Sequence, residues 1–299
     1  MSQRLLVPIE GAARDAEALA MARHIARQLS AAIILVHVAP ILFDIKEVVA
    51  AEQRLDAYAQ ALRAEGFEAH FVMEYGEPSA QIAEVGEQEQ AQMIILAPEQ
   101  RALLRRLLDP RVSRGLLGRS TIPLLILPDT APEDNTPGLL SDPDAVVIAA
   151  LDGSANAEAA LPIAIQLARA YDRRLLLVRV TPPVFVLGSG VEAMKARHDA
   201  QYDEEAEAHR YLVATRQRLA RDAAINAETL QLVGPVADQL IHLATMYPGS
   251  VLVMGTHGRG GLGRAMLGSV AAEMMSRATT PLVVVPPRPG QDTTDTVHP

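Results

Sequence analysis

Glycine is concentrated in one stretch of the sequence, MGTHGRGGLGRAMLGSV, at residues 254–270. The spacing is Gly255, two residues, Gly258, nine residues, and then the pair Gly268 and Ser269. An apolar strand pattern precedes the stretch and a helix pattern follows it. Glycines in such a loop let backbone amides approach an anion without an intervening Cβ, and the helix N-terminus adds free amides and its positive dipole end. The pattern indicates phosphate binding, and the alternative is a loop whose glycines only serve a tight turn.

Several side chains near these glycines have the chemistry to join such a site. Ser269 either caps the following helix or donates to a phosphate oxygen. Arg259 offsets polyphosphate charge in a chain whose net charge is −9, and His257 either contacts phosphate or orders the loop. Asp152 follows an apolar strand, and it either binds the ligand or caps the next helix. The candidates from the glycine stretch are Gly255, Thr256, His257, Gly258, Arg259, Gly260, Gly261, Gly268, Ser269 and Val270.

The two halves of the chain repeat one pattern. LLVPIEG and ILVHVAP match VIAALDG and LLVRVTP at an offset of 142 residues, and MIILAP and TIPLLILP match VLVMGT and TTPLVVVP at an offset of 158. The second half therefore has 16 additional residues, all between its second strand and Gly234. A register kept across four blocks predicts two copies of one domain. We expect a first domain at residues 1–128, a linker at 129–144, a second domain at 145–288 and a flexible tail at 289–299.

Each copy alternates apolar strands with helices rich in alanine and leucine. Continuous Val, Ile and Leu strands between amphipathic helices predict an α/β fold with a parallel sheet covered on both faces. In such sheets, ligands bind beyond the carboxyl ends of the strands, where the strand order reverses. Asp152 follows the first strand of the second copy and the glycine stretch follows the fourth, so we expect both at this edge.

The motif G-x2-G-x9-G-S after a fourth strand, with LDGS after the first and VRVTPP at the second, resembles the ATP-binding branch of the universal stress protein family. The resemblance covers essentially the whole chain as a tandem pair. It implies two Rossmann-like, adenine nucleotide alpha hydrolase-like domains, each with a five-stranded parallel sheet in the order 3-2-1-4-5. It also implies that Ala150 and Val180 flank the adenine. Asp152 would lie near the adenine and ribose and help to hold Mg²⁺, while the glycine loop binds the phosphates of ATP.

The first half departs from this motif at the positions that matter most. Its residues at the places of the four motif residues are Ala97, Gln100, Pro110 and Arg111, and Glu10 replaces the aspartate. Each replaced glycine adds a Cβ, and proline has no N–H to give to a phosphate. The first copy is therefore expected to keep the fold without the site, so that one ATP binds per chain.

Composition excludes several other functions. The chain has no cysteine, which rules out thiol catalysis and zinc–thiolate sites. The acidic balance disfavours nucleic acid and anionic membranes as partners. No stretch reaches the ~18 apolar residues of a membrane helix, so we expect a cytoplasmic protein. The two lysines, Lys46 and Lys195, lie outside any Walker motif, and the histidines show no metal-ligand spacing.

The resemblance implies a stress-response or signalling role, with ATP occupancy or slow hydrolysis as the switch. No Ser-His-Asp set, catalytic acid pair or Schiff-base lysine stands out, so dedicated catalysis is not predicted. Two alternatives stay open: a nucleotide-dependent hydrolase on a related α/β fold, and an interaction module that binds no nucleotide. Apolar edge strands are normally covered, so we expect the domains to pair within the chain through Pro123–Pro128 and Pro281–Pro286. A homodimer of chains is a further expectation.

Two segments of the second half allow a functional and a plain interpretation. The acidic run Asp203–Glu207 is interpreted as a solvated helix face rather than a carboxylate site. The stretch Val184–Met194 follows the second strand at the ligand edge, so it is either a lid over the nucleotide or a packed connection.

Overall fold

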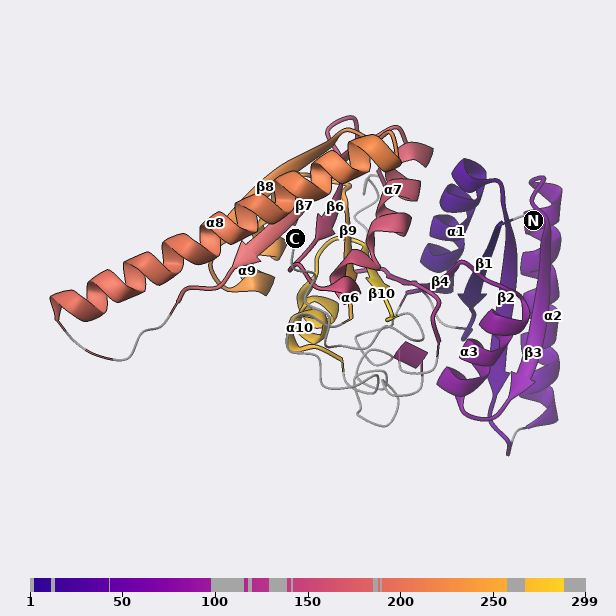
Figure 1. Ribbon diagram of the computed structural model, residues 1–299. Helices are drawn as coiled ribbons and strands as arrows, with labels where there is room; N and C mark the ends of the chain where they lie inside the picture. The colour runs from indigo at the N-terminus through magenta and orange to yellow at the C-terminus, as the bar shows by residue number, and fades with distance from the viewer. Residues whose placement is uncertain are drawn as a thin grey trace.

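The computed structural model describes most of the chain. The described residues are 3–11, 14–42, 44–97, 116–117, 120–128, 139–140, 142–184, 188, 190–256 and 267–287. Within them, the strands form one ten-stranded sheet in the order β3-β2-β1-β4-β5-β10-β9-β6-β7-β8 (Figure 1). The first half of the chain supplies one side of the sheet and the second half the other.

The elements alternate as the sequence predicts. Those of the first half are β1 (Gln3–Pro8), α1 (Asp15–Leu29), β2 (Ala31–Ala39), α2 (Ile45–Ala64), β3 (Ala69–Tyr75), α3 (Pro78–Gln88), β4 (Met93–Leu96) and β5 (Leu124–Ile126). Those of the second half are β6 (Val146–Ala150), α6 (Ala155–Glu158), α7 (Leu161–Ala170), β7 (Arg174–Thr181), α8 (Val191–Asp222), β8 (Ala227–Val233), α9 (Val236–Met246), β9 (Val251–Gly255), α10 (Ser269–Arg277) and β10 (Leu282–Val285).

All strand pairs within one half are parallel, and each half has its strands in the spatial order 3-2-1-4-5. The expected α/β fold is therefore confirmed. The two halves meet where β5 and β10 pair antiparallel, with Leu125 opposite Val283. Both strands are buried along their whole length, so this junction is part of the core.

Strand register reproduces the repeat seen in the sequence. Leu5 in β1 has Met93 as its Cα partner in β4, and Val147 in β6 has Val251 in β9. These pairs are related by the offsets of 142 and 158 residues. The extra length of the second half lies mainly in α8, which has 32 residues where α2 has 20. The rest lies in the connection before it, which has nine residues between β7 and α8 and five between β2 and α2.

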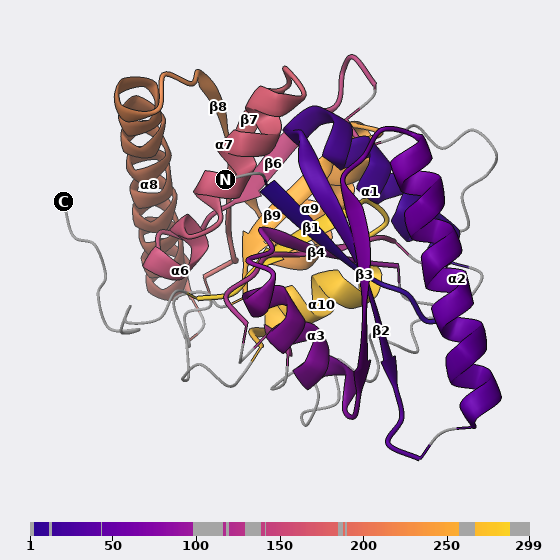
Figure 2. The same ribbon diagram turned by 90° about the vertical axis from the view of Figure 1, so that its right-hand side faces the viewer.

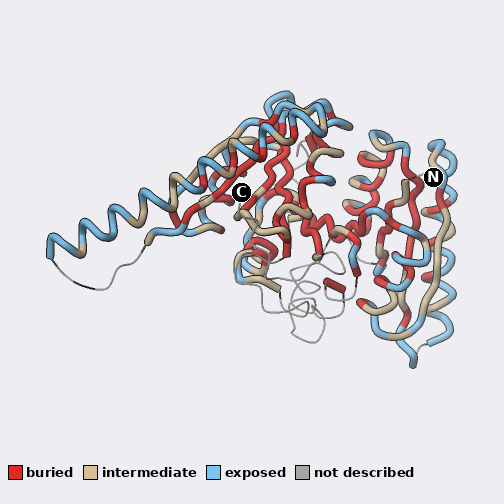
Figure 3. Tube along the Cα trace, viewed as in Figure 1, coloured by how far each residue is buried: buried red, intermediate tan, exposed pale blue. Residues whose placement is uncertain are grey.

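Helix α8 extends well beyond the sheet, as the orange helix in Figure 1 shows. Its buried residues, from Ala208 to Leu219, all lie in its C-terminal part, whereas Val191, Met194 and Tyr202 are exposed (Figure 3). The N-terminal half of α8 is therefore an exposed arm. No helix in the described ranges has the length and apolar character needed to cross a bilayer.

Apolar side chains cover both faces of the sheet. On one face, a single cluster joins α1, α2, α7 and α8 to strands of both halves, and α1 lies beside α7 (Figures 1 and 2). On the other face, α3, α9 and α10 pack on a second cluster. Polar contacts supplement the first cluster at the junction of the halves: Gln166 Nε2 donates to Gln3 Oε1 at 2.7 Å, and His24 Nε2 lies 2.6 Å from the carbonyl oxygen of Leu139.

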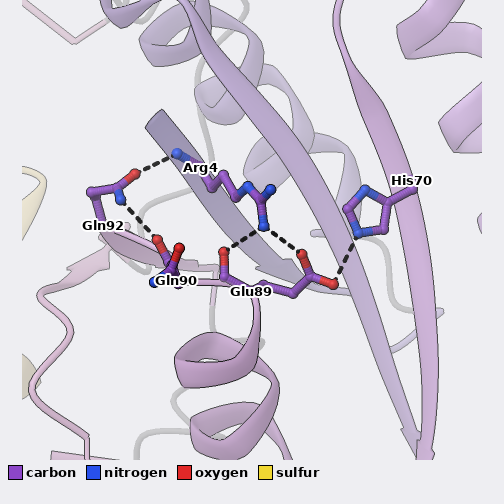
Figure 4. A network of polar contacts seen from close by, with 5 residues as sticks. All are labelled: Arg4, His70, Glu89, Gln90 and Gln92. Atoms are coloured by element: carbon purple, nitrogen blue, oxygen red, sulfur yellow. Dashed lines mark hydrogen bonds and ion pairs between the residues drawn. The ribbon is translucent and has the colours of Figure 1, made fainter. Parts of the chain in front are cut away.

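A network of charged side chains fastens the end of α3 to the amino edge of the first half (Figure 4). The guanidinium of Arg4 donates to the carboxylate of Glu89 at 3.0 Å and to its carbonyl oxygen at 2.9 Å. His70 Nε2 lies 3.2 Å from the same carboxylate, and the amide of Arg4 donates to the side chain of Gln92. Because Arg4 and His70 each lie near the amino end of a parallel strand, this network is at the amino edge of the first half, away from the carboxyl ends of those strands.

Candidate functional site

The described candidate residues of the second half lie near the place where the strand order reverses. β6 lies between β7 and β9, and the three strands are parallel, so their carboxyl ends share one edge. Ala150, the last residue of β6, is opposite Val178 and Met254. Asp152 follows β6 by two residues and Gly255 ends β9, which places them beyond adjacent strand ends. Ligands of doubly wound sheets bind at this kind of switch point.

Asp152 is held by the residue that starts the next helix. Its Oδ1 accepts hydrogen bonds from the amide of Ser154 at 2.9 Å and from the hydroxyl of Ser154 at 2.7 Å. The hydroxyl oxygen of Ser154 in turn accepts from the amide of Ala157 at 3.2 Å, so Ser154 is the N-cap of α6. Of the two roles weighed for Asp152, the cap thus belongs to Ser154 in the structure.

Gly255 is required for close packing rather than for an unusual backbone angle. It ends β9 and is absent from the described glycines with positive φ, so a left-handed backbone conformation is not the reason for glycine here. A Cβ at this position would lie 2.6 Å from the carbonyl oxygen of Asn156 in α6. Real Cβ atoms essentially never come so close to backbone. The missing side chain therefore lets α6 rest on the end of β9.

The second part of the glycine motif marks the start of α10, as predicted. Gly268 is the N-cap, in an extended conformation with φ −63° and ψ 149°, and Ser269 is the first helical residue. The N-cap residue, Gly268, has no side chain to cap the helix, and Ser269 lies one residue past the cap position. The amide of Gly268 donates to the carbonyl oxygen of Thr256 at 2.9 Å. The end of β9 and the start of α10 are thereby joined, and the first-turn amides of α10 have no intrahelical acceptor.

Three further candidate residues pack against the same apolar cluster. Ala150, Val180 and Val270 are partly buried against the cluster on the α9 and α10 face of the sheet. Thr256 is 1% exposed. The candidates His257, Gly258, Arg259, Gly260 and Gly261 lie outside the described residues.

A chain of polar side chains fastens α6 to α8, and sequence reasoning missed it. The hydroxyl of Tyr211 donates to Glu158 Oε1 at 2.9 Å, and Arg218 donates to Glu158 Oε2 at 2.7 Å. Burial raises the pKa of the Tyr211 hydroxyl, and the negative charges of Glu158 and Asp152 raise it further. Tyr211 therefore stays protonated and keeps donating at neutral pH.

A buried arginine lies next to Tyr211 and its hydrogen-bond partners. Arg179 of β7 is 2% exposed, and its Cζ lies 5.4 Å from the centroid of the Tyr211 ring. Its guanidinium pairs with Glu204 at 3.5 Å and with Glu207 at 3.3 Å. The acidic run Asp203–Glu207 is therefore not only a solvated face, because two of its members compensate a buried charge. An arginine inside the apolar strand LLLVRVT was the signal for this pairing.

The connection after β7 is only partly described. Residues 185–187 and 189 lie outside the described ranges. The amide of Val184 donates to the side chain of Gln201 at 2.9 Å, which ties the start of the connection to α8. Val191 and Met194 are 83% and 70% exposed, so these two residues are not packed.

The matching edge of the first half is arranged differently. Asp15 accepts hydrogen bonds from the amides of Glu10 and Gly11 at 3.2 and 2.8 Å. A Cβ at Gly11 would overlap the guanidinium of Arg54 from α2. A cation of the protein itself therefore lies against the loop that matches the Asp152 loop. Ala97 packs against the apolar cluster of the α1 face, while Gln100, Pro110 and Arg111 lie outside the described residues.

The described residues contain no group of three or more His, Asp or Glu side chains that could hold a metal ion. Asp152 by itself is the kind of ligand that Mg²⁺ prefers, and Mg²⁺ commonly binds through one or two carboxylates together with substrate phosphates. The carboxylate of Asp152 thus suits an Mg²⁺ ion that also binds the phosphates of a nucleotide.

Comparison with known proteins places both halves in one family. The sequence profile described as "Universal stress protein family" matches residues 1–128 and 146–286. A universal stress protein of Thermus aquaticus is 30% identical over 142 residues, which cover 46% of this chain and 96% of that protein. A universal stress protein of Mycobacterium tuberculosis is 28% identical over 157 residues, which cover 48% of this chain and 50% of that protein. The chain thus spans about half the length of the first curated relatives it matches.

A solved structure shares the fold of the whole chain. The crystal structure of a universal stress protein from Archaeoglobus fulgidus has a TM-score of 0.67. It is 18% identical and matches 97% of this chain and 98% of its own. At this identity the likeness concerns the arrangement of the elements.

Proposed function

Because the chain belongs to the universal stress protein family, we propose that its second domain binds ATP at the carboxyl edge of β6, β7 and β9. The observation that carries this proposal is the convergence of Asp152, Gly255 and the N-terminus of α10 at the point where the strand order reverses. A helix N-terminus with free amides favours a phosphate group, and a carboxylate beside it suits ribose hydroxyls or a metal ion.

Each part of the site receives a part of the nucleotide in this proposal. Ala150 and Val180 flank the adenine, and Asp152 lies near the ribose. When Mg²⁺ accompanies the nucleotide, Asp152 is its protein ligand and the phosphates provide the remaining oxygens. The residues proposed to bind the phosphates are Gly255, Thr256, His257, Gly258, Arg259, Gly260, Gly261, Gly268, Ser269 and Val270.

We further propose that the first domain binds no ATP. The motif residues are replaced there, and the guanidinium of Arg54 lies against the loop after β1. This division assigns residues 1–128 to a degenerate domain, 129–144 to a linker, 145–288 to the ATP-binding domain and 289–299 to a tail.

The proposed biological role is a cytoplasmic stress response or signalling step in which ATP occupancy of the second domain is the switch. The paired strands β5 and β10 are proposed to keep the two domains together in solution, because separation would expose two buried apolar strands. A homodimer of chains remains a further proposal. No described side chain stands out as a general base. The proposal therefore includes slow ATP hydrolysis but no dedicated catalysis.

Co-purification tests this function directly. The full chain is purified without added nucleotide, denatured, and its supernatant analysed by mass spectrometry, with the Gly268→Val variant prepared in parallel. We expect ATP from the wild type and none from the variant. A wild-type protein that releases no adenine nucleotide and takes up no ATP in equilibrium dialysis would contradict the proposal.

A further inference from the structure

The short helix α6 touches both parts of the candidate site. Its N-cap, Ser154, fixes the carboxylate of Asp152 through two hydrogen bonds. Its Asn156 carbonyl lies against Gly255, where the glycine loop begins. A shift of α6 would therefore move Asp152, and it would also change the contact between Asn156 and Gly255.

The side chain of Glu158 links α6 to α8. α6 has only four residues, which is too short to hold its own position through helix formation. Its last residue, Glu158, accepts one hydrogen bond from Tyr211 and one from Arg218, both on α8. A carboxylate that accepts from a hydroxyl and from a guanidinium at once is held more firmly than by one neutral hydrogen bond. The stacked Arg179 supports Tyr211 from β7.

The fold does not require this attachment, because the first half lacks it. Tyr211 and Arg218 each directly precede a buried leucine on the face of α8 that packs on the sheet. α2 has buried leucines with the same spacing of seven residues, so the matching places can be identified. The residues at the places of Glu158, Tyr211 and Arg218 in the first half are Ala16, Arg54 and Ala61. Among the described residues, the attachment is thus found in the half that keeps the glycine motif and not in the other.

We propose that Glu158, held by Tyr211 and Arg218, is a positioning residue for nucleotide binding: it fixes α6 so that the carboxylate of Asp152 keeps the geometry that the nucleotide needs. This inference rests on the proposed function of the second domain. It assigns α8 a role in the site although α8 itself contributes none of the residues proposed to touch the nucleotide.

The lead variant is Tyr211→Phe, which removes one donor to Glu158 and keeps the ring against Arg179. The matched control is Tyr202→Phe, on the exposed part of the same helix, where the side chain is 68% exposed. Isothermal titration of the full chain with ATP is expected to show about a fivefold weaker affinity for Tyr211→Phe, the equivalent of one net hydrogen bond. Tyr202→Phe is expected to match the wild type. Melting temperatures measured alongside confirm that both variants fold.

A double-mutant cycle separates positioning from a general loss of stability. If Tyr211 acts through α6 on Asp152, its effect should largely disappear when Asp152→Asn has already removed the carboxylate. In the Asp152→Asn background we therefore expect Tyr211→Phe to weaken ATP binding less than about twofold. A second variant, Glu158→Ala, removes both hydrogen bonds and should weaken binding about tenfold or more.

The outcomes distinguish this inference from the function on which it rests. A wild-type chain that binds ATP, together with Tyr211→Phe and Glu158→Ala variants of unchanged affinity, overturns the positioning role alone. Equal losses from Tyr211→Phe with and without the Asp152 carboxylate also overturn it. A wild-type chain that binds no ATP overturns both proposals.

Discussion

The Gly268→Val variant is expected to lose ATP binding while the second domain stays folded. Gly268 is the N-cap of α10, and its extended backbone angles are accessible to any residue. The branched side chain would stand in front of the first-turn amides of α10, where we place the phosphates. Loss of two charge-assisted hydrogen bonds, at about 1.5–3 kcal/mol each, weakens binding about a hundredfold or more.

The control for this variant places the same side chain at the other end of the helix. Ser276→Val lies in the last turns of α10 and is expected to leave the affinity unchanged. Equilibrium dialysis measures binding, and circular dichroism checks the fold. If Gly268→Val binds ATP as the wild type does, the assignment of the glycine motif to the phosphates is wrong.

Gly255→Ala is expected to act on stability first. The added Cβ would lie 2.6 Å from the carbonyl oxygen of Asn156. The Cβ is attached to the backbone of β9 and the oxygen belongs to the backbone of α6, so neither atom can move without shifting its element. Overpacking of this kind costs about 1–3 kcal/mol. Urea unfolding followed by circular dichroism should show this loss for the second domain.

The mirror change in the first half provides the comparison. Ala97→Gly at the matching position removes one methyl group and adds chain entropy, which together cost about 1–2 kcal/mol, and it introduces no close backbone contact. A Gly255→Ala protein as stable as the wild type would mean that α6 and β9 are not held as tightly as the structure shows.

Sequence patterns predicted the fold in some detail because strands and helices depend on local periodicity. The offsets of the repeat, read from blocks such as MIILAP and VLVMGT, reappear in the strand registers. The start of α10 at Gly268 and Ser269 was also visible, since a strand pattern and a helix pattern bracket the glycine stretch. The length of α8 was not predicted, although the 16 additional residues were located to that region.

What the sequence did not show are contacts between residues far apart in the chain. The reason for Gly255 is the backbone of Asn156, which is about a hundred residues away in the chain, and no local pattern records that contact. The hydrogen bonds of Glu158 to α8 have the same character. Arg179 was detectable as a charge in an apolar strand, but its partners Glu204 and Glu207 could be named only from the structure.

Titration of the full chain with ATP tests most directly the claim that one domain binds the nucleotide. The full chain is the right sample, since a first half on its own would expose β5 and its share of the joint core. Isothermal titration calorimetry is expected to give a stoichiometry near one for the wild type and no binding for Gly268→Val. A stoichiometry near two, or one remaining site in Gly268→Val, would contradict the assignment, because the first domain would then hold a nucleotide.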